Sequence, residues 1–242
     1  MTAVPLRFAG HDLLLDPLGA VIWPEAGLLA VADLHLEKGT AAALQGSLMP
    51  PWDTGLTLDR LETLIARWTP SIVVALGDSF HDRHGLARMD PTNQARLHAW
   101  TRQTRFVWVL GNHDPEPAPG LAGTMTHCWS LGGLDFCHQA RPGDGRRPEL
   151  VGHHHPKASI PTRAGTVTRP CFVAGASRLM LPALGAYTGG LDVASPAIAC
   201  LFPQGARAFL LGKGRLFGFP IAPASGSPIA AASDLPIACA EL

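Results

Sequence analysis

Five short polar clusters occur in a fixed order along the chain, and their side chains are of the kinds that bind metal ions. They contain Asp33 and His35, then Asp78, then Asn112 with His113 and Asp114, then His138, and finally His153 and His155. Most clusters follow an apolar run, at residues 28–32, 72–76, 106–110 and 134–137. Because a strand fixes the backbone while the loop after it frees the side chain, polar residues at strand ends build sites in open α/β sheets. We therefore expect the clusters to meet.

The spacing within the clusters predicts how two metal ions could be held. Asp33 and His35 are two residues apart, so at an extended strand end both side chains point to the same side and can hold one ion. His153 and His155 repeat this spacing, with His154 pointing away. Asp78 has two carboxylate oxygens that could bridge ions about 3.5–4 Å apart.

The second ion would be completed by Asn112, whose amide oxygen is neutral, and by His138. Oxygen and nitrogen donors without thiolate favour manganese, iron or a mixed pair over structural zinc. Taken singly, each cluster has an ordinary explanation, such as a surface turn, an Asx turn after a strand or a histidine-rich tract. The five together, in order, favour the metal site.

The apolar pattern predicts an α/β fold in two halves. Short runs at 13–15, 20–23 and 28–32 indicate a hairpin that leads into a first central strand. Helical spacing from Thr57 to Trp68, strand 72–76, a helix from Pro91 to Gln103 and strand 106–110 give a parallel layout. Short runs at 134–137, 149–151, 171–174, 197–202, 206–211 and 215–219 predict a strand-rich second half. We expect one domain over residues 1–219 and a disordered Ala/Pro/Ser-rich tail over 220–242.

Composition bounds the class of protein. Lys plus Arg and Asp plus Glu are 19 each, so no excess of positive charge indicates tight binding of long nucleic acid. The five cysteines form no C-x-x-C pair, which predicts reduced and mostly buried thiols. The N-terminus lacks a basic segment followed by a long apolar one, and no apolar run is long enough to cross a membrane. We expect a soluble, cytoplasmic protein without a membrane partner.

The five clusters, over about residues 28–156, resemble the signature of the calcineurin-like metallophosphoesterases. The stretches 32–39, 76–82 and 185–192 resemble a narrower group, the ligase-associated (PdeM-like) phosphoesterases of bacteria, which are encoded beside a DNA ligase, a helicase and an exonuclease. The resemblance implies a four-layer α/β/β/α sandwich of two stacked mixed sheets. It also implies phosphodiester hydrolysis with two divalent ions, manganese above iron or zinc, and a role in DNA repair.

The family pattern assigns a role to each matching residue. It places Asp33, His35, Asp78 and His155 on one metal ion, and Asn112, His138, His153 and the shared Asp78 on the other. His113 matches the residue that faces the scissile phosphate, as leaving-group acid or transition-state stabiliser, and Asp114 is a candidate to orient it. Many family members have an acid shortly after the Gly-Asp, where this chain has His81 and Asp82, and their roles stay open.

Substrate contacts and the natural substrate are less constrained. Lys38 and Arg83 lie just past metal motifs and, with Arg178, could touch a substrate phosphate, although a solvated surface charge is as good an interpretation. The favoured function is a metal-dependent phosphodiesterase or nuclease that acts on DNA ends. The alternatives are a phosphoesterase of small nucleotides or diphosphates, and a non-catalytic binding module on the same fold.

Overall fold

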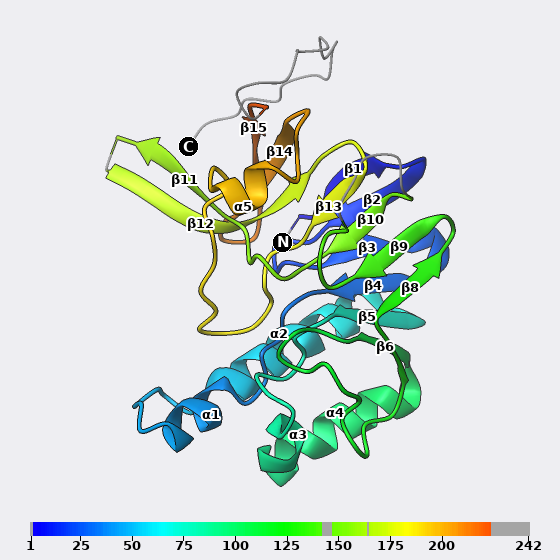
Figure 1. The fold of residues 1–242 in the computed structure, drawn as a ribbon. Helices are drawn as coiled ribbons and strands as arrows, with labels where there is room; N and C mark the ends of the chain where they lie inside the picture. Colours follow the sequence, from blue (N-terminus) through cyan, green and yellow to red (C-terminus); the bar gives the residue numbers. More distant parts are fainter. Residues whose placement is uncertain (1, 142–146, 164, 224–242) are drawn as a thin grey trace.

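Two β-sheets stack face to face in the computed structural model, which describes residues 2–141, 147–163 and 165–223 (Figure 1). Helices cover the outer face of the first sheet, and one short helix lies on the side of the second. This arrangement confirms the predicted α/β fold with two stacked mixed sheets. The outermost layer on the second sheet is thin, because within the described residues it contains only the single turn α5 (Pro196–Ala199).

The first sheet has the strand order β1-β2-β3-β4-β5-β6-β7, antiparallel up to β4 and parallel from β4 onward. Its strands are β1 (Val4–Phe8), β2 (His11–Leu15), β3 (Val21–Trp23), β4 (Leu28–Val31), β5 (Ile72–Leu76), β6 (Arg105–Val109) and β7 (Thr124–Thr126). The central strand β5 is apolar on both faces, as a parallel strand covered on both sides must be. Val73 and Ala75 face the helices, whereas Val74 and Leu76 face the second sheet.

The second sheet has the order β15-β14-β12-β13-β10-β9-β8, with β11 paired to β12. The strands are β8 (Cys128–Leu131), β9 (Leu134–Cys137), β10 (Glu149–Val151), β11 (Lys157–Thr162), β12 (Gly165–Ala174), β13 (Arg178–Met180), β14 (Ala206–Leu211) and β15 (Leu216–Ile221). β10 runs parallel to both β9 and β13. The hairpin of β11 and β12 projects away from the sheet stack (Figure 1).

The helices are short except for two. They are the 3-10 turn η1 (Pro24–Ala26), α1 (Lys38–Leu44), α2 (Asp53–Trp68), α3 (Gly85–Arg88), α4 (Pro91–Gln103) and α5. The predicted bounds of α4 are confirmed: the Asp90 carboxylate accepts hydrogen bonds from the backbone N–H groups of Thr92 and Asn93, and Pro91 occupies the first turn. α2 begins at Asp53, one turn before the apolar spacing that predicted it.

Three apolar clusters hold these layers together. The first lies between the two sheets and includes Phe136 and Phe172. The second lies between the first sheet and the helices, and it includes the predicted helical stripe of Leu58, Leu61 and Leu64. The third covers the outer side of the second sheet around Val173. The carboxyl ends of the central strands are therefore fixed by buried residues on both sides.

Two details of the predicted second half are wrong. Residues 197–202 were expected to form a strand, but Pro196 and the three residues after it form the helical turn α5. The apolar run is equally compatible with a buried helix turn, and a proline in its first turn favours the helix. Strand β15 reaches Ile221, so residues 220 and 221 pair with β14 and do not belong to the tail. Residues 222 and 223 are described and have no regular secondary structure, and the rest of the predicted tail, 224–242, lies outside the described residues.

The expected state of the cysteines is also wrong in part. Cys128 and Cys137 are joined by a disulfide. They lie directly opposite each other on the antiparallel strands β8 and β9, a juxtaposition that sequence spacing does not reveal. Cys171 is buried as expected, whereas Cys200 is exposed, and Cys239 is outside the described residues. Among the described residues, no helix combines the length and apolar character that crossing a membrane requires.

Candidate metal centre

The candidate ligands come from the strand ends of both sheets. Asp33, Asp78 and Asn112 follow β4, β5 and β6 of the first sheet. His138 directly follows β9 of the second sheet, and the pair His153 and His155 follows β10. Parallel neighbours end at the same edge, so each sheet gathers its own residues there, and stacking the sheets brings the two sets together.

The first group consists of Asp33, His35 and His155, whose potential ligand atoms all lie within 4.8 Å of one another. The Nε2 atoms of His35 and His155 are 3.2 Å apart. His155 Nε2 is also 3.4 Å from Asp33 Oδ1. Two imidazole nitrogens that face each other beside a carboxylate form a set of donors suited to a divalent cation.

The second group consists of Asp78, His138 and His153. His138 Nε2 lies 3.4 Å from Asp78 Oδ2, 3.1 Å from His153 Nδ1 and 3.0 Å from the amide oxygen of Asn112. The other ring nitrogen of His138, Nδ1, lies 2.9 Å from the carbonyl oxygen of Leu76 and must donate to it. Burial acts to lower the pKa of His138, but the nearby carboxylates of Asp78 and Asp33 more than offset this and raise it. When Nε2 gives up its proton, its lone pair points at the group, as is typical of metal-binding histidines.

Asp78 connects the two groups. Its Oδ2 atom is 3.4 Å from His138 Nε2 in the second group and 3.8 Å from His35 Nε2 in the first. Its Oδ1 atom accepts a hydrogen bond from the backbone N–H of His113, which holds the carboxylate in place. The His and Asp clusters are thus consistent with a dinuclear metal site.

The backbone at these residues differs from the extended geometry that the spacing predicted. Asp33, His35, Asp78, His153 and His155 all have positive φ angles, between 44° and 72°. Asp33 and His35 share a group as expected, and His153 and His155 belong to different groups, as the family pattern assigns them. Asp and His tolerate the left-handed region better than most residues do, and such conformations concentrate at functional sites.

The pKa values of His35 and Asp78 suit cation binding. Burial, together with the neighbouring His155, lowers the pKa of His35 to about 3, so its ring is neutral at neutral pH. Burial acts to raise the pKa of Asp78, but its hydrogen bond with His138 and further partners more than offset this and lower it to about 2. Neutral imidazole and ionised carboxylate are the states that coordinate metals.

Close backbone packing holds the carboxylates rigidly. A Cβ atom added to Gly152 would lie 2.6 Å from Asp33 Oδ2, and one added to Gly111 would collide with Asp78 Oδ1. Larger residues at these two positions would displace a carboxylate. The glycines of the motifs are therefore part of the site, because they let the backbone of one strand end approach the side chain of another.

His113 lies beside the two groups, next to His81. Its Nδ1 atom is 2.9 Å from the carbonyl oxygen of His81, to which it must donate, and the two rings stack with centroids 5.0 Å apart. His35, His81 and His113 form a third set of close ring nitrogens. The sequence left the role of His81 open. Its position in the same loop as Asp78, three residues further on, is the sequence feature that indicates a place at the centre.

Asp114 was expected to orient the His113 ring, but its carboxylate has other partners. Its carboxylate accepts hydrogen bonds from the backbone N–H groups of Ser79, Phe80 and Gly111, at 2.8, 3.1 and 2.9 Å. Burial raises the pKa of this carboxyl to about 6 despite these bonds. Asp114 thus joins the loop after β5 to the loop after β6, and it can affect His113 only through the backbone.

The three expected substrate contacts differ in their surroundings. Lys38 Nζ donates to the carbonyl oxygen of Tyr187 at 3.0 Å, and Arg83 is exposed, with its Nε 3.0 Å from His84 Nε2. Arg178 is engaged elsewhere: its three guanidinium nitrogens bind Glu149, the Leu201 carbonyl and the Arg141 carbonyl. It pairs with Glu149, at the end of β10 away from the centre, so a substrate contact by Arg178 is not supported.

Comparisons with known proteins agree with this geometry. Residues 27–164 match the family model of the calcineurin-like phosphoesterases. The crystal structure of Pseudomonas putida nuclease MPE is 30% identical and covers 90% of this chain and 100% of its own, with a TM-score of 0.70. Yfce, a phosphoesterase from E. coli, is 16% identical over 80% of this chain and 98% of its own, with a TM-score of 0.41.

A comparison with curated proteins gave no match. The family match spans more than half of the residues and contains all of the candidate ligands. The solved nuclease structure extends the likeness to nine-tenths of the chain. The protein is a hydrolase of phosphoester bonds, and it belongs to the calcineurin-like phosphoesterase family.

Proposed function

We propose that the chain is a divalent-metal-dependent phosphodiesterase that cleaves single-stranded or short DNA ends. The observation that carries this proposal is the pair of His/Asp groups that meet at Asp78 Oδ2. The 30% identity to a nuclease supports nucleic acid as the substrate class. The resemblance to the ligase-associated group supports a cytoplasmic role in DNA repair alongside a ligase, a helicase and an exonuclease.

In this proposal each group binds one cation. One ion is held by Asp33, His35, Asp78 and His155, and the other by Asp78, Asn112, His138 and His153. Two divalent cations, when bound, would neutralise phosphate charge and lower the pKa of water. Manganese suits the mixture of carboxylate, amide and imidazole donors.

His113 supplies proton transfer to the leaving group. The His81 carbonyl accepts the Nδ1 proton of His113, so Nε2 is the atom that gains and gives the exchangeable proton. The leaving group of a diester departs as an alkoxide, and His113 can give it a proton. The single negative charge of a diester needs less neutralisation than the two charges of a monoester. We therefore expect diesters to be cleaved faster than monoesters.

Metal removal and a substrate panel test the proposal. The chelated enzyme should be inactive towards bis(p-nitrophenyl) phosphate, and manganese should restore more activity than magnesium or zinc. In manganese buffer, the diester should react faster than p-nitrophenyl phosphate, and a single-stranded oligonucleotide faster than a duplex. Full activity of the metal-stripped enzyme would contradict the metal assignment. Preference for the monoester, with no cleavage of any nucleic acid, would instead favour a small-molecule nucleotide or diphosphate phosphoesterase.

A further inference from the structure

The loop between β13 and α5 passes along the first His/Asp group. The Gly185 N–H donates to the carbonyl of Asp33 at 3.1 Å, and the Leu191 N–H donates to the carbonyl of His154 at 3.2 Å. The loop is thus anchored beside Asp33 at one end and next to His155 at the other. In Figure 1 this yellow segment descends from the second sheet towards α1 and α2. Tyr187, the only tyrosine of the chain, lies between the two anchor points.

Tyr187 has a backbone conformation that its side chain disfavours. Among the described residues, nine non-glycine residues have a positive φ, and seven belong to the loops of the centre: Asp33, His35, Glu37, Asp78, His153, His155 and Tyr187. Asp and His visit this region with some ease, but it is unusual for a bulky aromatic residue. Tyr187 has φ 60° although glycines stand nearby at 185, 189 and 190. A strained residue persists only where its surroundings hold it, and here strain coincides with the site.

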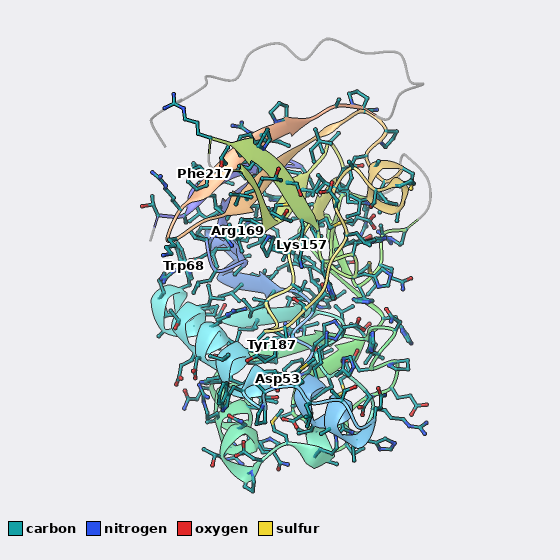
Figure 2. The ribbon with its side chains drawn as sticks, turned by 90° about the vertical axis from the view of Figure 1, so that its left-hand side faces the viewer. Asp53, Trp68, Lys157, Arg169, Tyr187 and Phe217 are labelled. Carbon is teal, nitrogen blue, oxygen red and sulfur yellow. A yellow bond between two sulfur atoms is a disulfide. The ribbon has the colours of Figure 1, made fainter. Side chains whose placement is uncertain are left out.

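The loop at Tyr187 offers an aromatic ring, and a positively charged side chain binds its backbone. Lys38 Nζ donates to the Tyr187 carbonyl, and the neighbouring Ala186 N–H donates to Thr57 Oγ1 of α2 at 2.9 Å. Figure 2 labels Tyr187 together with Asp53, the first residue of α2. The Tyr187 residue is 41% exposed. An isolated exposed apolar side chain needs no explanation. Here, however, the exposed ring belongs to a residue whose carbonyl binds an ammonium group, so the loop offers a nucleotide both a ring and a cation.

We propose that Tyr187 stacks on a base of a single-stranded nucleic acid substrate and that Lys38 contacts the phosphate next to that base. This inference rests on the phosphodiesterase function proposed above. Proteins that bind single strands pair aromatic platforms with basic groups in this way. The zero formal net charge makes stacking important, because the protein has no excess of cations to supply affinity through phosphate contacts. A duplex, whose bases are already stacked, cannot use the ring.

Four variants test the inference, each measured as the ratio of kcat/KM for a single-stranded oligonucleotide to kcat/KM for bis(p-nitrophenyl) phosphate. Tyr187→Phe keeps the ring and should keep the ratio. Tyr187→Leu and Tyr187→Gly should lower it by roughly 5- to 150-fold, mainly through KM, which corresponds to about 1–3 kcal/mol for one stacked base. Leu44→Ala, which removes an exposed apolar side chain at the far end of α1, should leave it unchanged.

Tyr187→Gly also controls for folding, because glycine adopts a positive φ without strain and should not lower the melting temperature. A series of oligonucleotides with one abasic nucleotide at successive positions locates the stacked base. Wild-type enzyme should be slowed by one position in particular, and Tyr187→Gly should be insensitive to it. An unchanged ratio in Tyr187→Gly overturns the stacking, as does a wild-type enzyme active only on the small diester. Wild-type enzyme inert towards both substrates overturns the phosphodiesterase function itself.

Discussion

At the scale of single residues, most of the candidate ligands lie on residues whose backbone adopts the left-handed conformation. Asp33, His35, Asp78, His153 and His155 all have positive φ, so the sharp turns after β4, β5 and β10 each direct side chains into one of the two His/Asp groups. Alternation along an extended strand would have put His153 and His155 on one side. The turns instead send them to different groups, which meet at Asp78.

Substitutions of Asp78 and His113 should have different effects. Asp78→Asn removes the charge that both groups share, so we expect the metal content of the purified protein to fall at both positions. His113→Ala should keep the metal and slow oligonucleotide cleavage by about 10²–10⁴-fold, the usual contribution of general-acid catalysis. Elemental analysis measures the metal content, and kinetics measure the rate of oligonucleotide cleavage. If His113→Ala lost metal as severely as Asp78→Asn did, His113 would be a ligand and its proposed role would be wrong.

At the scale of elements, the loops after the strands are tied to one another and not only to their own strands. Leu36 and Phe80 form a bridge between the loops that follow β4 and β5. The buried Asp114 carboxylate then joins the loops that follow β5 and β6. The ligands are therefore positioned together, and a displacement of one loop should also displace the ligands on the next loop.

Asp114→Ala should test this coupling. It removes three hydrogen bonds to buried backbone N–H groups near Asp78 and Asn112 without removing a candidate ligand. We expect manganese affinity, measured by calorimetry, to fall by about 10- to 100-fold, as is usual when a partner of a ligand is lost. Glu116→Ala, in the same segment but exposed, is the matched control and should bind manganese normally. Unaltered affinity in Asp114→Ala would mean that the loops keep their places without this carboxylate.

Elements and residues differ in how far the sequence predicts them. Strands β5 and β6 and helix α4 could be located because their signals are local: a buried apolar run, or a proline in the first turn behind a capping Asp. The motif residues gathered because parallel strands end at one edge. Contacts between distant segments were not accessible in this way. The disulfide of Cys128 and the ion pair of Arg178 with Glu149 depend on the register between strands, which the spacing of one segment does not contain.

At the scale of the whole molecule, the centre lies where the two sheets meet. The first sheet contributes Asp33, Asp78 and Asn112, whereas the second contributes the histidines that follow β9 and β10. Apart from this polar contact, the sheets are joined by the apolar cluster around Phe136 and Phe172. Cations bound at the centre would connect the sheets at their polar edge, so metal binding and global stability should be linked.

Thermal unfolding with and without manganese measures this linkage. A ligand that binds only the folded state stabilises it by about 2.7 kcal/mol at 100 times its Kd. For a protein of this size, that should raise Tm by roughly 5–11 °C. The rise should be smaller in His35→Ala and in His153→Ala, which each weaken one group, and smallest in Asp78→Asn, which weakens both. His98→Ala removes a histidine on α4, outside the groups, and should show the full rise. His35 belongs to the first sheet and His153 to the second, so an equal reduction of the Tm rise in the two variants would mean that both sheets contribute to metal binding. If only one of the two substitutions reduced the Tm rise, the sheet that carries that histidine would be the sole support of the metal.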